Sequence, residues 1–183
     1  MTRISTPATI ADAPDASRPL LTAVAKQLGS VPNMFRAIAL SPQALEGYLG
    51  MSGALAKGSL PAATRERIAL AVAEVNGCIY CLSAHTDLGR NVAKLDDAEI
   101  TANRNGASND SKADAALRFA TKVTKSRGHV TDSDFAAVKL GGYTDAQVIE
   151  IVQHVALNVW TNFFNEVFQT EVDFPVVEAG EAA

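Results

Sequence analysis

The sequence predicts an all-α protein. Apolar residues recur at helical spacing through almost every segment, whereas β-branched runs with period-two alternation are absent. Alanine is abundant, and helix start and stop signals separate the apolar segments. We therefore expect an N-terminal arm over residues 1–16 and a single helical domain over residues 17–183.

Capping signals place the first two helices. The arm has no periodic pattern, so we expect it to be ordered only if it packs against the rest of the chain. A helix over Ser17–Leu28 is predicted from its serine N-cap and from Gly29 after its end. Ser41-Pro42 starts the next helix, because proline at the first helical position loses no needed N–H group, and Gly58 is expected to close it.

The middle of the chain predicts a helical hairpin. One helix is expected over Pro61–Val75, and Asn76-Gly77 is a strong stop signal. Cys78 then stands at or just inside the N-terminus of a second helix, which runs to about Asn91.

Four further helices and one polar loop follow towards the C-terminus. Asp96 with Glu99 predicts a capping box for a short helix, and residues 105–110 read as a polar loop. Helices are then expected over residues 111–125, from Thr131 with Asp134 at its third position, and from Thr144 with Gln147 to Phe168 or beyond.

A weak internal repeat occurs at an offset of eighty residues. At this offset the apolar positions from Leu60 to Val75 align with those from Leu140 to Val155. The site positions Cys78, Cys81 and His85 align with Asn158, Thr161 and Asn165. Two readings stay open: a duplicated helical hairpin of which one copy kept its thiols, or two amphipathic helices that share a pattern.

Composition excludes several classes of protein. The chain has 183 residues, 48% of them hydrophobic, and its 16 basic against 20 acidic residues give no electrostatic footprint for nucleic acid. We expect no membrane span, because no apolar run reaches about 18 residues. The first residues lack the apolar core of a signal peptide, so we expect a cytoplasmic protein. Two cysteines three residues apart do not make a disulfide scaffold.

The two thiols form the main candidate site together with a histidine. On a helix, Cys78, Cys81 and His85 lie within about one-sixth of a turn of one another. A helix N-terminus stabilises a thiolate, which is the nucleophilic form of cysteine. The spacing thus favours one reactive sulfur and a second that resolves a sulfenate or a mixed disulfide.

Two other roles for the thiols stay open. Buried cysteines can act as small hydrophobes, although a pair after an Asn-Gly break with a histidine one turn on is poor design for inert packing. The same three side chains with one further ligand could hold zinc, although no second CxxC or HxxxH exists in the chain. We favour redox chemistry, with no metal and no cofactor.

Two acids compete for the role of site carboxylate. Glu74 shares the polar face of its helix with Arg67, where a solvated salt bridge is the expected role. Glu66 lies among small apolar residues, where a carboxylate needs a partner or a function. In an antiparallel hairpin Glu66 comes level with His85, so we expect Glu66 to orient or protonate that imidazole, which relays protons for the thiols. Pairing of Glu66 with a neighbouring arginine is the alternative.

The segment ERIALAVAEVNGCIYCLSAH resembles the signature of the alkyl hydroperoxidase D-like branch of the carboxymuconolactone decarboxylase-like family. That signature is a glutamate, eleven residues, CxxC, three residues and a histidine, which here are Glu66, Cys78, Cys81 and His85. The similarity extends to Asn33-Met34-Phe35 and to the C-terminal tail. In some members a histidine precedes the second cysteine, where this chain has Tyr80.

The resemblance implies a fold, an assembly and an activity. It implies an all-helical homo-oligomer, commonly a trimer or hexamer, and thiol-dependent reduction of hydroperoxides by an oxidoreductase of peroxiredoxin-type activity. By analogy Cys81 would attack the peroxide, Cys78 would resolve the disulfide, and Glu66 with His85 would form the proton relay. Members named for muconolactone decarboxylation typically lack the CxxC pair, which argues against that reaction here.

Three hypotheses for the function follow. The first is a hydroperoxide reductase recycled by an external thiol or dithiol donor. The second is a thiol–disulfide adaptor that reduces a partner protein, and the third is an oligomeric helical protein with structural or metal-bound thiols. Outside the motif, we expect His154 to be a satisfied core or interface histidine, and the polar stripe of Asn158, Thr161, Asn162 and Asn165 to face either the thiols or a subunit groove.

Overall fold

Helix α4 (Ala62–Asn76) is the central helix of the structure, a computed structural model that describes residues 2–180. Four helices pack around it: α5 (Ile79–Asn91), α6 (Asp97–Arg104), α7 (Ser111–Ser126) and α9 (Asp145–Phe168). Its side chains Ile68, Leu70 and Val72 are fully buried. The residues described contain no strand, so the prediction of an all-α fold is confirmed.

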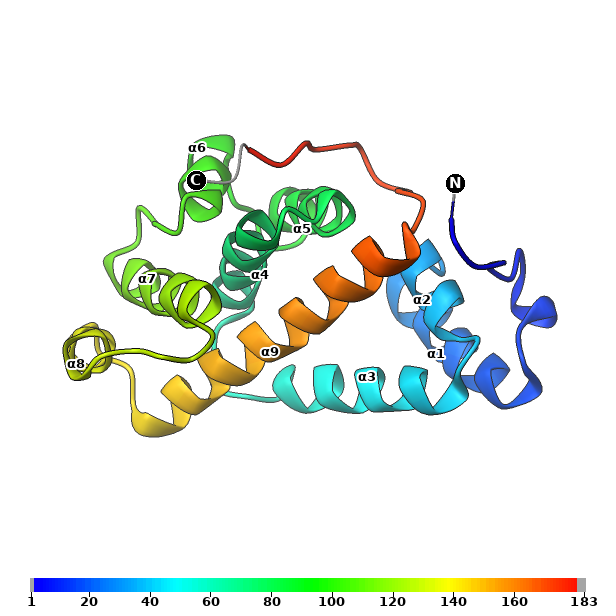
Figure 1. The fold of residues 1–183 in the computed structure, drawn as a ribbon, viewed down its shortest axis with the longest axis horizontal. Helices are drawn as coiled ribbons and strands as arrows, with labels where there is room; N and C mark the ends of the chain where they lie inside the picture. Colours follow the sequence, from blue (N-terminus) through cyan, green and yellow to red (C-terminus); the bar gives the residue numbers. More distant parts are fainter. Residues whose placement is uncertain (1, 181–183) are drawn as a thin grey trace.

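The remaining helices lie at the two ends of α9 (Figure 1). Helices α1 (Arg18–Leu28), α2 (Asn33–Ile38) and α3 (Pro42–Leu55) gather near its C-terminal half, and α8 (Asp132–Leu140) precedes its N-terminus. Helix α3 also packs directly on α9. The site described below lies where the first three helices meet α4, α5 and α9.

The predicted caps account for most helix boundaries. The side chains of Ser41, Thr131 and Thr144 each accept a hydrogen bond from a backbone N–H three residues on, and the last two form the predicted capping boxes. Gly29 and Gly77 end α1 and α4 in the left-handed conformation, with φ of 80° and 67°.

Four details at the N-terminal side differ from the sequence predictions. The side chain of Ser17 does not cap α1, because its hydroxyl donates to the carbonyl oxygen of Ala39 at 2.7 Å. Helix α2 was not predicted, because its six residues are too few to show a period. The arm contains 3-10 turns at Ile10–Asp12 and Asp15–Ser17, and it packs inward through the buried Ala13. Helix α3 ends at Leu55, three residues before Gly58, where a Cβ atom would lie 2.7 Å from a carboxylate oxygen of Glu150.

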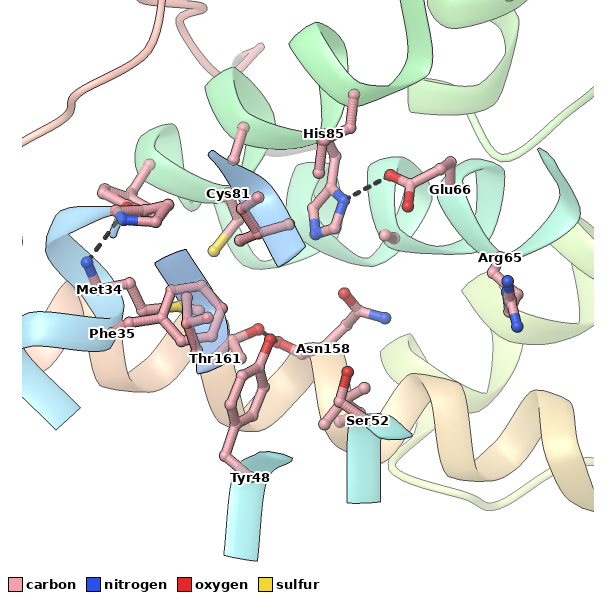
Figure 2. Close-up of a pocket in the computed structure, with 18 of the residues that line it drawn as sticks. Met34, Phe35, Tyr48, Ser52, Arg65, Glu66, Cys81, His85, Asn158 and Thr161 are labelled. Carbon is pink, nitrogen blue, oxygen red and sulfur yellow. Dashed lines mark hydrogen bonds and ion pairs between the residues drawn. The ribbon is translucent and has the colours of Figure 1, made fainter. Parts of the chain in front are cut away.

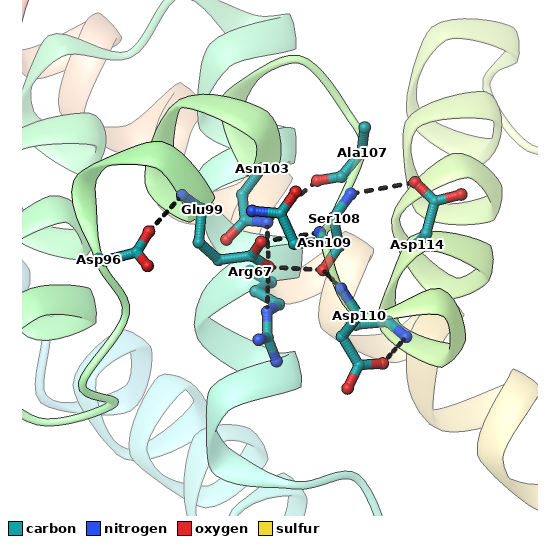
Figure 3. Close-up of polar contacts among 10 residues, drawn as sticks. Arg67, Asp96, Glu99, Asn103, Ala107, Ser108, Asn109, Asp110 and Asp114 are labelled. Atoms are coloured by element: carbon teal, nitrogen blue, oxygen red, sulfur yellow. Dashed lines mark hydrogen bonds and ion pairs between the residues drawn. The ribbon is translucent and has the colours of Figure 1, made fainter.

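The capping box predicted at Asp96 forms only in half. Asp96 accepts from the backbone N–H of Glu99, but the Glu99 carboxylate accepts from Nε of Arg67 at 2.7 Å rather than from the cap (Figure 3). Ser108 and the backbone N–H of Asn109 also donate to it, so Glu99 fixes the predicted polar loop against α4. Although burial opposes ionisation, these bonds lower the pKa of Glu99 to about 2.

The duplicated hairpin is wrong at the proposed offset. In the first copy Gly77 separates α4 from α5, but the corresponding Leu157 lies inside α9, which continues unbroken from Asp145 to Phe168. The matching apolar positions therefore reflect two amphipathic helices packed on one core. Among residues 2–180, no helix is long and apolar enough to cross a membrane.

Candidate active site

The α4–α5 hairpin brings the two thiols into direct contact. Cys78 is the N-cap of α5, and its Sγ accepts from the backbone N–H of Cys81 at 3.2 Å. The Sγ atom of Cys78 donates to Sγ of Cys81 at 2.6 Å, and both cysteines are buried and free of disulfide bonds. The backbone N–H at the start of α5 therefore donates to Cys78 and not to Cys81. Other groups stabilise the Cys81 thiolate.

The environment separates the acidities of the two thiols. The hydrogen bond from Cys78 lowers the pKa of Cys81 to about 7; burial opposes this shift, and the nearby His85 supports it. The same hydrogen bond and burial raise the pKa of Cys78. Near neutral pH Cys81 is therefore partly ionised, beside a protonated Cys78.

Glu66 and His85 meet across the hairpin as the sequence predicts. Nδ1 of His85 lies 2.8 Å from Oε2 of Glu66 (Figure 2), and their side chains are 22% and 23% exposed. Burial disfavours the imidazolium, but the charge and hydrogen bond of Glu66 outweigh it and raise the pKa of His85. Glu74 is in a salt bridge, as predicted, but with Arg104 on α6 at 2.6 Å.

Amides on α9 complete the surroundings of Cys81. Nδ2 of Asn165 donates to Sγ of Cys81 at 3.3 Å and contributes to the low pKa of this thiol. Sequence reasoning placed these amides in a polar stripe without assigning them to the thiols. The signal for them was the cluster of amides on an otherwise apolar helix.

A cavity of about 480 Å³ lies beside Cys81 (Figure 2). Cys81, His85 and Glu66 line it, whereas Cys78 does not. Much of its wall is apolar or aromatic and includes Met34, Phe35, Tyr48, Leu49 and Phe174. Of the two sulfurs, a small molecule in this cavity reaches that of Cys81.

Tyr80 has an anchoring position rather than a place in the proton path. Its hydroxyl accepts from the backbone N–H of Met34 at 3.1 Å and donates to Oδ1 of Asp173 at 2.9 Å. Its ring also contacts Phe174 edge-on. Tyr80 thereby holds residues 170–180, which we term the C-terminal strap, across α2 and α5.

His154 differs from its prediction in one respect. It is buried, with 5% of its surface exposed, but its Nε2 atom has no hydrogen-bond partner. Burial, with Arg65 nearby, lowers the pKa of His154 to about 4, so the ring is neutral at pH 7.

The arrangement gives no support to the zinc alternative. In the part of the chain that the structure describes, no three or more His, Cys, Asp or Glu side chains are grouped so that they could hold a metal ion. What the site combines is a thiolate, a second thiol in contact with it, and an imidazole paired with a carboxylate.

In fold and in thiol site the chain is similar to proteins of the alkylhydroperoxidase D-like class. Two crystal structures of uncharacterised peroxidase-related proteins share the fold: one from Ralstonia eutropha JMP134, described as an alkylhydroperoxidase AhpD core, and one from Silicibacter sp. TM1040. The first is 26% identical with a TM-score of 0.84, over 94% of this chain and 92% of that one. The second is 25% identical with a TM-score of 0.79, over 93% and 94%.

The carboxymuconolactone decarboxylase family model matches residues 42–125, which include Glu66, both cysteines and His85. The resemblance to the alkyl hydroperoxidase D-like branch of that family is confirmed. The debrominase Bmp8, in complex with 2,3,4-tribromopyrrole as a cysteine-to-alanine variant, shares the fold at 20% identity and a TM-score of 0.79, over 94% of each chain. A search of curated protein sequences finds no match.

Proposed function

We propose that this protein is an oxidoreductase that reduces organic hydroperoxides with its CxxC pair. The Cys81 thiolate attacks the terminal peroxide oxygen, the O–O bond breaks, and the alkoxide leaves as an alcohol with a proton from His85. The resulting Cys81 sulfenic acid is attacked by Cys78, the S–O bond breaks, and water leaves as the disulfide forms. An external dithiol then reduces the disulfide and is itself oxidised.

One observation carries this proposal: the sulfur with the lowered pKa is also the one that lines the cavity. A peroxidatic cysteine must be a thiolate and must be reached by its substrate. The second thiol lies behind it, in contact with it at 2.6 Å and outside the cavity. This order of the two sulfurs supports Cys81 as the attacking residue and Cys78 as the resolving one.

The thiol–disulfide adaptor is less favoured because both sulfurs are buried. Cys78 and Cys81 are 0% and 3% exposed. Direct exchange with a protein disulfide needs in-line access of a second chain to one sulfur, whereas a small peroxide or dithiol can enter the cavity.

Separate cysteine variants test the proposal. With an organic hydroperoxide and a dithiol donor, Cys81→Ser should abolish peroxide consumption, whereas Cys78→Ser should form a Cys81 sulfenic acid or mixed disulfide without multiple turnover. Absence of peroxide consumption by the unaltered protein with any organic peroxide would rule the enzyme out. Bromide release from 2,3,4-tribromopyrrole in place of peroxide consumption would assign the thiols to reductive dehalogenation.

We also propose that the chain forms a homo-oligomer through α9. Exposed apolar side chains at helical spacing make a narrow stripe along this helix, which we term the α9 stripe: Ile149, Val152, Ala156, Trp160, Phe163 and Val167. Phe163 is 57% and Ile149 67% exposed, and exposed apolar patches of this kind are typical of interfaces. Phe163→Glu should reduce the mass measured by light scattering to that of a smaller species; an unchanged mass, or a monomer before substitution, would reject the interface.

A further inference from the structure

The cavity has two chemically different ends. Met34 and Phe35 lie beside Cys81 on one side, and Arg65 lies on the other side, beyond Glu66 (Figure 2). Ser52 and Asn158 lie nearer the Arg65 side. A molecule that fills the cavity therefore meets an apolar surface, the reactive sulfur and a cationic group in turn.

The guanidinium of Arg65 is held in place with one edge unused. Its Nη1 atom donates to the carbonyl oxygens of Leu55 and Ala56 at 3.1 and 2.9 Å, at the C-terminal end of α3. Its Nε and Nη2 atoms have no hydrogen-bond partner within residues 2–180. The Arg65 side chain also forms no ion pair with these residues. That Nε–Nη2 edge has the geometry that binds a carboxylate through two parallel hydrogen bonds.

His154 supplies an independent second observation. It lines the same cavity near Arg65, is 95% buried, and has an Nε2 atom without a partner. The Nε2 atom is itself buried, and leaving it unsatisfied costs about 1–3 kcal/mol, so a ligand that it reaches when the imidazole turns towards the cavity would complete the site. The acids near it are engaged elsewhere, because Glu66 pairs with His85 and Glu150 accepts from the backbone of Ser59.

We propose that Arg65 and His154 form a carboxylate-binding subsite, and that the substrates are organic hydroperoxides that carry a carboxylate. The substrate class rests on the function proposed above. The acid group binds at Arg65, the hydroperoxide lies at Cys81, and an apolar chain continues over Phe35 and Tyr48. A hydroperoxide in the middle of a fatty-acid-like chain has this order of groups, and the cavity volume is within the usual range for small-molecule sites.

The charges favour a monoanion over a phosphate. No lysine of residues 2–180 lines the cavity, and its wall also contains two acids, Asp87 and the Glu66 that is paired with His85. A dianionic phosphate would be left with one uncompensated charge, whereas a carboxylate matches one guanidinium and one neutral imidazole.

Binding of an unreactive ligand tests the subsite without peroxide chemistry. The probe is a medium-chain hydroxy acid, the alcohol that the reaction would yield, compared with its methyl ester by titration calorimetry. The acid should bind about 10- to 100-fold more tightly than the ester, the range that charge-assisted hydrogen bonds supply. Arg65→Gln should remove this preference, His154→Gln should reduce it, and Arg118→Gln, on an exposed arginine of α7, should keep it.

Arg65→Lys separates a binding role from a folding role. Lysine keeps the charge and a donor for the α3 carbonyls but lacks the bidentate edge, so the variant should fold and lose most of the preference for the acid. Equal binding of acid and ester by the unaltered protein would overturn the subsite.

Turnover of the hydroperoxides of the same acid and ester separates this inference from the proposed function. A higher kcat/KM for the acid, lost in Arg65→Gln, supports both. An acid preference in binding without any turnover supports the subsite and refutes the peroxidase. Equal turnover with equal binding refutes the subsite and leaves the peroxidase in place.

Discussion

Asn165 on α9 donates from Nδ2 to Sγ of Cys81 on α5 at 3.3 Å, although 84 residues separate them in sequence. Asn165 also contacts Sδ of Met34, so one amide links the reactive sulfur to the apolar side of the cavity. A neutral donor directed at a sulfur favours its charged form. The acidity of Cys81 thus depends on the packing of α9 against α5.

Replacing Asn165 should make Cys81 less acidic. In Asn165→Leu the sulfur loses a donor at similar side-chain volume, so the midpoint of its alkylation should rise from near pH 7 by about one unit, the size expected for one hydrogen bond to a charged group. The rate of alkylation by iodoacetamide as a function of pH, with the modified cysteine identified by mass spectrometry, measures the shift. Asn105→Leu, at an exposed amide, is the matched control. An unaltered midpoint in Asn165→Leu would contradict this role.

Glu66 should control turnover through His85. Because the charge of Glu66 raises the pKa of His85, Glu66→Gln should lower that pKa and reduce the fraction of imidazolium. The alkylation midpoint of Cys81 should then move to higher pH, and peroxide turnover should fall about 10²- to 10⁴-fold, the usual contribution of a general acid or base.

Glu74→Gln is the control for this prediction. Glu74 belongs to the same helix and forms a comparable salt bridge, but it does not line the cavity. Turnover should stay near the unaltered level in Glu74→Gln, and equal losses in the two variants would indicate a structural effect rather than proton transfer.

Local signals in the sequence were sufficient for the hairpin and the thiol pair. Asn76-Gly77 fixes the turn, and the hairpin alone brings Glu66 level with His85, so their contact follows from spacing within twenty residues. The contact between Asn165 and Cys81 could not be predicted in the same way. It depends on which face of α9 packs against α5, and long-range packing decides this. The partly free Arg65 and the unpartnered His154 also depend on where α3 ends and how it packs on α9.

Tyr80→Phe should loosen the C-terminal strap. The variant leaves the backbone N–H of Met34 and one oxygen of Asp173 without their partner, so the free energy of unfolding should fall by about 1–3 kcal/mol. Denaturant unfolding measures the loss, and hydrogen exchange should increase in residues 170–180 before it increases in α4. Tyr143→Phe, on a buried tyrosine away from the strap, should leave exchange in residues 170–180 unchanged. Strap exchange that does not change in Tyr80→Phe would contradict the anchoring role.

Glu99 should make the protein sensitive to acid. Its pKa lies at about 2 in the folded chain against an ordinary value of 4.5, so the ionised carboxylate stabilises the fold above about pH 5, and this stability is lost as the pH falls towards 2. The shift corresponds to roughly 3 kcal/mol, and the side chain is only 7% exposed. Glu99→Gln should therefore lower the free energy of unfolding at pH 7 and flatten its dependence on pH between 5 and 2, as measured by denaturant unfolding at each pH. Glu171→Gln, at an exposed acid, should keep the steep dependence of the unaltered protein, and an equally steep curve in Glu99→Gln would show that another group controls acid unfolding.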